Sequence, residues 1–190
     1  MKRAFIAARD RPDGVNLGLE RLRCSIWWQG KGGMVWGEIF RKIKSLMKVN
    51  DIPQYLILHC GANDIGNVPL KDLIQQIKKT LCRIQLLLPK TKLIWSQLLP
   101  RNKWRYSDHM EPMNKALKRL NNSIASEIIK NGGCYIKYPD IKAGKELLFR
   151  ADGVHLSDIG NDIFLNTICA AMEQFVRQEL MFTLNYIKKW

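Results

Sequence analysis

Short apolar segments alternate with longer amphipathic segments along this chain, and the alternation limits the folds that it can adopt. Four segments are short, rich in β-branched or aromatic residues and bounded by Gly, Pro or charge, as is typical of buried strands: residues 24–28, 55–60, 92–99 and 134–138. Helical spacing of apolar residues predicts helices over 34–49, 71–88 and 111–131 and a further helix after Ser157. This order favours a parallel sheet with helices on both faces.

The length and composition fit one domain. The chain has 190 residues, of which 46% are apolar, and this is enough for one hydrophobic core. We find no linker, repeat or low-complexity block, so we expect a single α/β domain over residues 1–190. No apolar window approaches the length that a membrane span requires. The stretch AFIAA near the N-terminus is too short for a secretory signal.

The cysteines argue against a secreted, disulfide-bonded protein. There are five of them, an odd number, with wide spacing and no C-x-x-C pair. We therefore predict buried free thiols and a cytoplasmic or nuclear location. The three histidines lie apart from any cysteine pair, except that His59 precedes Cys60. We find no metal signature, and no cofactor is implied.

The net charge of +14 is the strongest signal of the composition. Residues 71–105 hold nine Lys or Arg and one acidic residue, whereas residues 51–70 hold no Lys or Arg. A basic field of this size favours polyanions such as nucleic acid or an anionic membrane surface. The alternative is a solvated basic surface that only keeps the protein soluble. If nucleic acid binds, Trp104 in RNKWRY is the best candidate for stacking on bases, next to Arg101 and Lys103.

Three polar motifs follow predicted strands, at the sheet edge where parallel α/β proteins collect their chemistry. In LILHCGANDIG, Asn63 follows a strand directly, and its amide could donate to an oxyanion. In QGKGGM, the glycines at 30–33 leave backbone N–H groups free to approach a ligand. In DGVHLS, Asp152 and His155 could form a general base and the carboxylate that orients it.

Each motif also has a simpler explanation. Asp152 and His155 could have a purely structural role, as a turn that caps the following helix. Asn63 and Asp64 could likewise cap the helix that follows them. For a single motif the simpler explanation is the commoner one. Three such motifs at three strand ends favour a functional site.

Together these motifs resemble conserved blocks of the SGNH (GDSL-type) hydrolases, a family with a flavodoxin-like three-layer α/β/α sandwich and a Ser–His–Asp site. Residues 61–64 (GAND) match the family's Gly-x-Asn-Asp block, and Asp152 with His155 matches its Asp-x-x-His block. Gly33 corresponds to the glycine of the second block, with Gly30 as the alternative. The stretches WQGKGGMVW, LIWSQLLPR and DGVHLSDIGNDIF also resemble esterase-like domains of vertebrate genomes, some of them in retrotransposon-derived reading frames.

The resemblance implies a role for each of these residues. His155 would accept the proton of a serine hydroxyl, and Asp152 would fix the imidazole tautomer. Asn63 and the N–H of Gly33 would stabilise the oxyanion of the tetrahedral intermediate. The substrate implied is a small carboxylic ester.

The family's first block, a Gly-Asp-Ser turn after the first strand, has no counterpart in this sequence. Residues 1–19 resemble the helix and loop that follow that serine, so we expect the sheet to lack the family's first strand. Ser96 and Ser157 are the serines to test first as substitutes, although neither is convincing. Two explanations stay open, namely an N-terminally incomplete copy or a pseudoenzyme.

The expected function therefore has two versions. In the first, the chain is an esterase domain that hydrolyses carboxylic esters when the missing nucleophile is supplied, and is inactive or nearly so without it. In the second, it is a non-catalytic basic module for nucleic-acid binding or self-association in a mobile-element-derived protein. The oligomeric state stays open.

Overall fold

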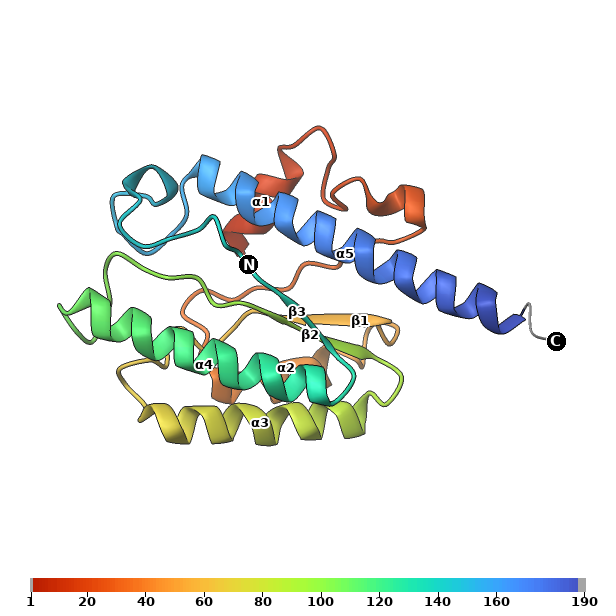
Figure 1. The fold of residues 1–190 in the computed structure, drawn as a ribbon, viewed down its shortest axis with the longest axis horizontal. Coiled ribbons are helices and arrows are strands. Elements are labelled where there is room, and N and C mark those ends of the chain that lie inside the picture. Colours follow the sequence, from red (N-terminus) through yellow and green to blue (C-terminus); the bar gives the residue numbers. More distant parts are fainter. Residues whose placement is uncertain (1, 188–190) are drawn as a thin grey trace.

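Helices cover both faces of a short parallel sheet in the computed structural model of this chain (Figure 1), which describes the backbone of residues 2–187 and the side chains of residues 3–179. The strands are β1 (Tyr55–Leu58), β2 (Lys92–Ser96) and β3 (Cys134–Ile136). The helices are α1 (Lys2–Arg9), α2 (Ile39–Leu46), α3 (Leu70–Leu87), α4 (Met110–Lys130) and α5 (Asp158–Ile187). Short 3₁₀ turns lie at Leu19–Leu22, Trp36–Glu38 and Glu146–Leu148.

The sheet has the order β1-β2-β3, and both pairs are parallel. Tyr55 is opposite Lys92 in the first pair, and Ile94 is opposite Cys134 in the second. Three of the four predicted strands are thus present, and each ends two or three residues earlier than the apolar run that predicted it. The predicted α/β class with a parallel sheet is confirmed.

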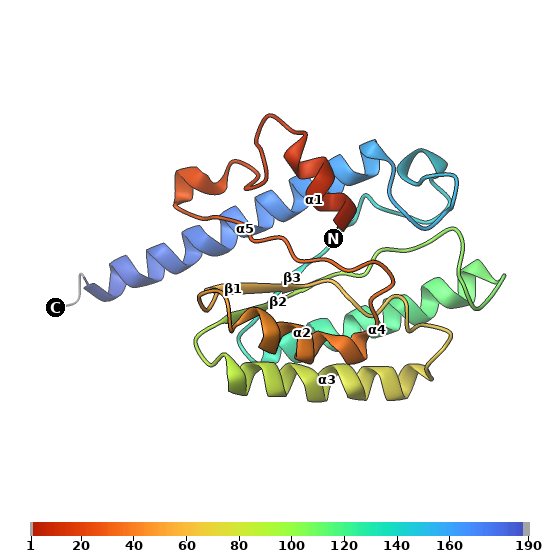
Figure 2. The same ribbon diagram turned by 180° about the vertical axis from the view of Figure 1, so that it is seen from behind.

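Two hydrophobic clusters lie on opposite faces of the sheet because successive strand residues point to opposite sides. Leu93 and Trp95 of β2 pack with α2, α3 and α4, whereas Ile94 packs with α1 and α5. Figure 2 shows the two helical layers from behind, with α1 and α5 on one side of the strands and α2, α3 and α4 on the other. The result is a three-layer sandwich.

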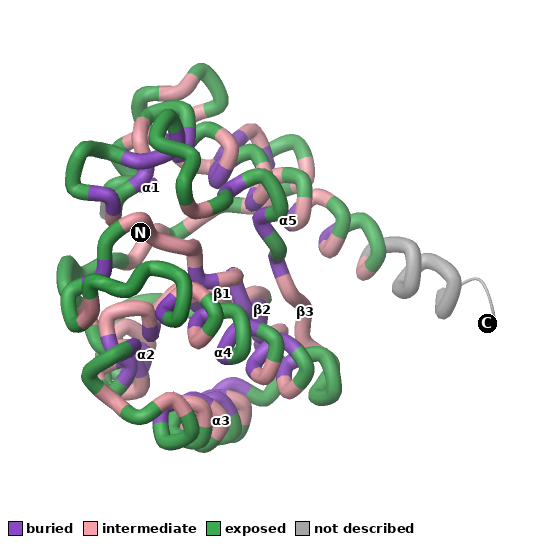
Figure 3. Tube along the Cα trace, turned by 60° about the vertical axis from the view of Figure 1, so that its left-hand side comes forward, coloured by how far each residue is buried: buried purple, intermediate pink, exposed green. Residues whose placement is uncertain are grey.

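The helices expected over 71–88 and 111–131 form where the apolar spacing placed them, whereas the helix expected over 34–49 is shorter and consists of the 3₁₀ turn Trp36–Glu38 followed by α2. In α3, Leu73, Ile77, Leu81 and Ile84 are buried, and the helix ends two residues before Pro89. In α4 the apolar face is buried in the same way, and the chain turns at Gly132, which has a φ of +78°. Figure 3 shows buried residues facing the sheet and exposed residues facing outward. The helix expected after Ser157 is α5, which projects beyond the sheet in Figure 1.

Residues 24–28 are extended but belong to no strand, so the prediction of a strand there was wrong. Burial alternates as in a strand, because Cys24, Ile26 and Trp28 are half-buried whereas Ser25 and Trp27 are exposed. The alternation of burial that the sequence pattern predicted is therefore present, although the strand is not. The hydrogen-bonded ladder is missing because, within residues 2–187, no strand lies against this segment.

The segment 24–28 and strand β1 contribute to the same hydrophobic cluster without pairing with each other. Ile26 and Trp28 pack in the α1/α5 cluster, as do Tyr55 and Ile57 of β1. The N–H of Ile26 donates instead to the side chain of Asn16, at 2.7 Å. In the described part of the chain, β1 pairs with β2 alone, so its other edge is free.

Two further expectations concern the cysteines and membrane-spanning segments. All five cysteines are free, as predicted, but four are half-buried and Cys82 on α3 is exposed, so the prediction of buried thiols was wrong. Among the described residues, no helix has the length and apolarity needed to cross a membrane.

Candidate active site

Asp152 and His155 lie together in the loop before α5. His155 Nδ1 is 2.7 Å from Asp152 Oδ2, and Asp152 Oδ1 accepts the N–H groups of Val154 and His155, each at 2.9 Å. One carboxylate oxygen thus holds the backbone turn while the other holds the imidazole. The turn and the contact between carboxylate and imidazole, considered above as alternatives, are both present. The side chains are 48% and 44% exposed, so a ligand can reach them.

The hydrogen bonds keep the Asp152 carboxylate charged. Desolvation raises the pKa of Asp152, but the N–H groups of His155 and Val154 and the imidazole of His155 lower it more. The pKa therefore lies below the ordinary value of 3.8. A carboxylate that is charged at neutral pH can orient an imidazole and stabilise the imidazolium that forms when the ring accepts a proton.

The loop after β2 supports the Asp152–His155 loop. The carbonyl oxygen of Gly153 accepts the N–H groups of Asn102 and Lys103, at 2.8 and 3.1 Å. Gly153 has a φ of +65°, and a Cβ atom there would lie 2.9 Å from Cγ of Lys103. Only glycine satisfies both the backbone conformation and the close approach without strain.

Asn63 joins the end of β1 to the glycine-rich segment. Its Nδ2 donates to the carbonyl oxygen of Met34 at 3.0 Å, next to Gly33 in the chain. Gly61, with a φ of +119°, permits the turn that brings Asn63 there. Gly33 has a φ of +67°, and its N–H donates to no other described residue. The two predicted oxyanion donors therefore come from adjoining segments.

Arg101 is a site residue that the sequence analysis did not place here. We considered it only as a possible contact for nucleic acid, but its Nη2 donates to Asn63 Oδ1 at 3.1 Å, and the side chain is half-buried. A guanidinium only donates, so this bond fixes the amide oxygen of Asn63 toward Arg101 and the amide nitrogen toward Met34. The available signal was a cation two residues after the apolar end of a predicted strand, behind Pro100.

Asp64 forms a hydrogen bond with the backbone just after the glycine-rich segment. Its side chain is 6% exposed, and Oδ2 accepts the N–H of Trp36 at 3.0 Å. Burial raises the pKa of Asp64. The carboxylate thus caps the turn that leads into α2. The simpler explanation, that Asn63 and Asp64 cap the following helix, does not describe these two side chains, because they bond to residues 34–36 and Arg101.

No serine among the described residues contacts His155. Ser96 is fully buried, and its Oγ lies 3.0 Å from His59 Nδ1 and 2.7 Å from the hydroxyl of Tyr138. Ser157 donates to the carbonyl oxygen of Leu147 and accepts the N–H of Gly160, so it caps α5 as expected. The described residues thus bring Asp152 and His155 together, and none of the hydrogen bonds among them joins His155 to a serine.

Trp104 is not an exposed stacking platform. It is 8% exposed and belongs to the cluster between the sheet and α4. The polar neighbours in RNKWRY suggested exposure, but the indole turns into the core while Lys103 and Arg105 face solvent. This part of the nucleic-acid hypothesis was wrong.

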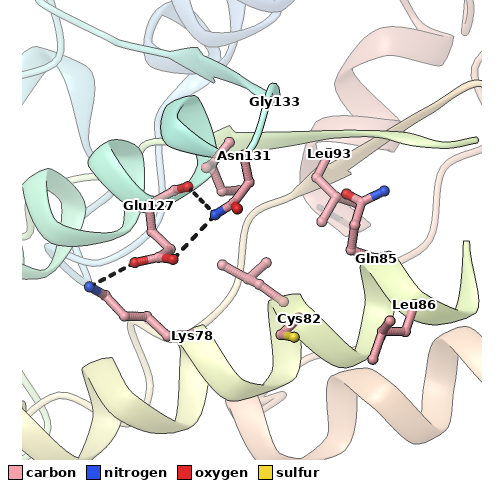
Figure 4. A pocket seen from close by; sticks show the side chains of 10 residues that line it. Lys78, Cys82, Gln85, Leu86, Leu93, Glu127, Asn131 and Gly133 are labelled. Atoms are coloured by element: carbon pink, nitrogen blue, oxygen red, sulfur yellow. Dashed lines mark hydrogen bonds and ion pairs between the residues drawn. The ribbon is translucent and has the colours of Figure 1, made fainter. Parts of the chain in front are cut away.

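A separate pocket lies between α3 and α4 (Figure 4), lined by Cys82, Gln85, Leu93 and Gly133 among others. Lys78 forms an ion pair with Glu127 at 2.9 Å on one side of it. Leu93 and Gly133 mark the amino ends of β2 and β3, whereas the candidate site lies at the carboxyl ends. The pocket is therefore distinct from the candidate site. Among the described residues, no group of His, Cys, Asp or Glu could hold a metal ion.

The comparison with solved structures identifies the class of fold. The chain is similar to a GDSL-like lipase from Bacteroides thetaiotaomicron, with 18% identity, a TM-score of 0.64 and coverage of 77% of this chain and 74% of that chain. It is also similar to the family 3 carbohydrate esterase of Clostridium thermocellum, with 20% identity, a TM-score of 0.62 and coverage of 79% and 70%. A member of the lipolytic G-D-S-L family from Veillonella parvula gives 17% identity, a TM-score of 0.59 and 76% coverage of each chain.

This chain thus has the SGNH hydrolase fold. The sequence matches no family model and no curated protein, so the likeness rests on the fold. The resemblance to retrotransposon-associated domains stays a prediction.

Proposed function

We propose that this domain is an SGNH-type esterase module that hydrolyses small carboxylic esters once a serine nucleophile is supplied. His155 acts as the general base, and Asp152 orients it. Asn63 and the N–H of Gly33 stabilise the oxyanion. Without a serine at the site, the domain is inactive or nearly so.

The observation that carries this proposal is the geometry of Asp152 and His155. A carboxylate 2.7 Å from Nδ1 leaves Nε2 of the ring as the nitrogen that can accept a proton from a nucleophile. The backbone of the same loop is held by two N–H donors from the loop after β2, so the ring sits on a supported turn. A surface aspartate that only capped a helix would need neither contact.

The free edge of β1 supports the second part of the proposal, that the serine comes on an added strand. Strand β1 and the extended segment 24–28 both pack in the α1/α5 cluster, yet neither pairs with the other. Buried parallel strands normally have their N–H and C=O groups paired on both sides. We place a serine-bearing strand from outside residues 1–190 at this edge, so that its carboxyl end lies beside Asn63.

The experiment compares hydrolysis of a short-chain aryl ester by three proteins: the 190-residue chain, the same chain with an N-terminal strand that ends in a Gly-Asp-Ser turn, and that extended form with His155→Ala. We expect the extended form to exceed the chain by about 10³-fold or more, and His155→Ala to abolish the gain. His109→Ala is the matched control, because His109 is exposed and outside the site.

Two results would reject the proposal. One is a folded extended form that hydrolyses the ester no faster than the chain. The other is activity that survives His155→Ala, since the base would then lie elsewhere. If the unextended chain is fully active, only the proposal of an added strand is rejected. The search for a nucleophile would then begin at Ser96 and Ser157.

A further inference from the structure

We infer that Arg101, together with Asn63, forms a binding site for a small monocarboxylate at the carboxyl ends of the strands. The identity of the ligand rests on the proposed function, because a carboxylic acid is the product of ester hydrolysis. The site itself requires no serine.

The charge of Arg101 lacks a counter-ion among the described residues. The guanidinium is half-buried, and none of the ion pairs among the described residues includes it. Its side-chain hydrogen bond goes to the neutral amide oxygen of Asn63, which uses one of its five N–H donors. A partly buried cation without an anion is costly, and desolvation accordingly lowers the pKa of Arg101. An anionic ligand would remove that cost.

Arg101 is held in place before any ligand binds. The Arg101 N–H donates to Asn114 Oδ1 at 3.0 Å, and Asn114 Nδ2 donates back to the Arg101 carbonyl oxygen at 2.8 Å. The guanidinium carbon lies 5.1 Å from the ring centre of Trp104, a cation–π contact. A planar guanidinium that is already oriented loses little freedom when it binds a carboxylate with two hydrogen bonds.

Arg101 also lies among the residues of the candidate site. It bonds to the proposed oxyanion donor Asn63, and the next two residues, Asn102 and Lys103, hold the Asp152–His155 loop through Gly153. The pKa of His59, at the end of β1, is lowered mainly by the burial of its imidazole. The charge of Arg101 lowers it further. The guanidinium of Arg101 thus lies near the carboxyl ends of the strands. A carboxylate product released at Asn63 would lie next to this positive charge.

The test measures acetate binding to the 190-residue chain by the shifts of backbone and Asn side-chain amide signals in NMR spectra. Sodium chloride keeps the ionic strength constant, because a chain of net charge +14 binds anions without specificity. We expect saturable binding in which the side-chain amide of Asn63 shifts. Arg101→Gln should weaken acetate binding by about tenfold or more, since hydrogen bonds between charged groups are the strong ones.

Two further variants make the result specific. Arg105→Gln removes the same charge from an exposed position of the same loop, so it should change the affinity less than twofold. Arg101→Lys keeps the charge but loses the two-pronged geometry, so its affinity should fall several-fold and stay above that of Arg101→Gln. Urea unfolding checks that each variant is folded. If Arg101→Gln does not fold, the acetate affinity of Arg101→Lys alone tests the inference.

The inference is overturned if acetate shifts no signal beyond the chloride control. It is also overturned if Arg101→Gln, or Arg101→Lys where the Gln variant does not fold, binds acetate as tightly as the unchanged chain. Because no serine is needed, these outcomes are separate from those of the ester assay. If the 190-residue chain binds acetate but the extended form does not hydrolyse the ester, the anion site is retained and the esterase proposal is rejected.

Discussion

His59, at the end of β1, is an imidazole in an apolar setting. Its ring packs edge-on against Phe164 with 5.4 Å between ring centres, and Nδ1 lies 3.0 Å from the buried hydroxyl of Ser96. Burial lowers the pKa of His59 from its ordinary value of 6.5 to about 3, and the charge of Arg101 acts in the same direction. The ring is therefore neutral in the folded protein at any pH well above 3.

This residue should make the fold sensitive to acid. Between pH 6.5 and about 3 the unfolded chain binds a proton at His59 that the folded chain does not, so the free energy of unfolding falls as the pH falls through that window. In His59→Gln we expect the loss between pH 7 and pH 4 to be smaller by about 3 kcal/mol. Urea unfolding at several pH values measures it. The exposed His109→Gln serves as the control, and parallel curves for all three proteins would contradict the prediction.

At the level of elements, Asn121 connects α4 to the central strand and to the loop after it. Its amide oxygen accepts Nε1–H of Trp95 at 3.1 Å and the N–H of Leu98 at 2.9 Å, and its amide nitrogen donates to the Leu98 carbonyl oxygen at 2.9 Å. The side chain is buried. These bonds set how the chain leaves β2 toward the loop that carries Arg101.

Asn121→Ala should therefore destabilise the fold strongly. The substitution leaves buried donors and an acceptor without partners, which costs about 3 kcal/mol or more. Asn122→Ala, one position along the same helix but exposed, should change the free energy of unfolding by less than about 0.5 kcal/mol. Chemical denaturation of both variants measures the difference, and similar small losses would mean that the bonds to Asn121 contribute little.

The contact between the two site loops gives a second prediction at this level. Gly153 and Gly144 both have φ values near the left-handed region, +65° and +79°, but a Cβ at Gly153 would meet Lys103 whereas a Cβ at Gly144 would meet open space. Alanine at either position costs about 1 kcal/mol in backbone strain. We expect Gly153→Ala to cost more and to perturb NMR signals of residues 101–103. Equal losses without that perturbation would argue that the loops do not depend on each other.

For the whole molecule, the net charge of +14 has a measurable consequence. A single-stranded oligonucleotide should bind weakly and without sequence preference, and its affinity should fall by about tenfold or more between 50 and 200 mM salt, because phosphate contacts release counter-ions. Fluorescence anisotropy with a labelled oligonucleotide measures this at both salt concentrations. Absence of binding at 50 mM, or an affinity that salt does not change, would exclude the basic surface as a site for nucleic acid.

Much of the fold could be predicted because its signals are local. Apolar spacing along α3 and α4 placed each helix within a residue of where it lies, since periodicity depends only on which face of a helix is buried. The motif around Asp152 and His155 is also local, because the two residues are three apart and the turn between them makes the contact. The position of Asn63 at the carboxyl ends of the strands could be predicted because parallel strands end at one edge of the sheet, whereas its role there stays a prediction.

The tertiary structure decided what depends on partners distant in sequence. Residues 24–28 have the alternation of a strand, but a strand also needs a neighbour for its N–H and C=O groups, and no local pattern reveals whether one is there. Trp104 is flanked by charges yet faces the core. Arg101 became a site residue through one bond to Asn63, 38 positions away. By itself the sequence determined the elements and the short-range motif; long-range packing determined which polar groups meet, because burial and pairing are properties of the folded neighbourhood.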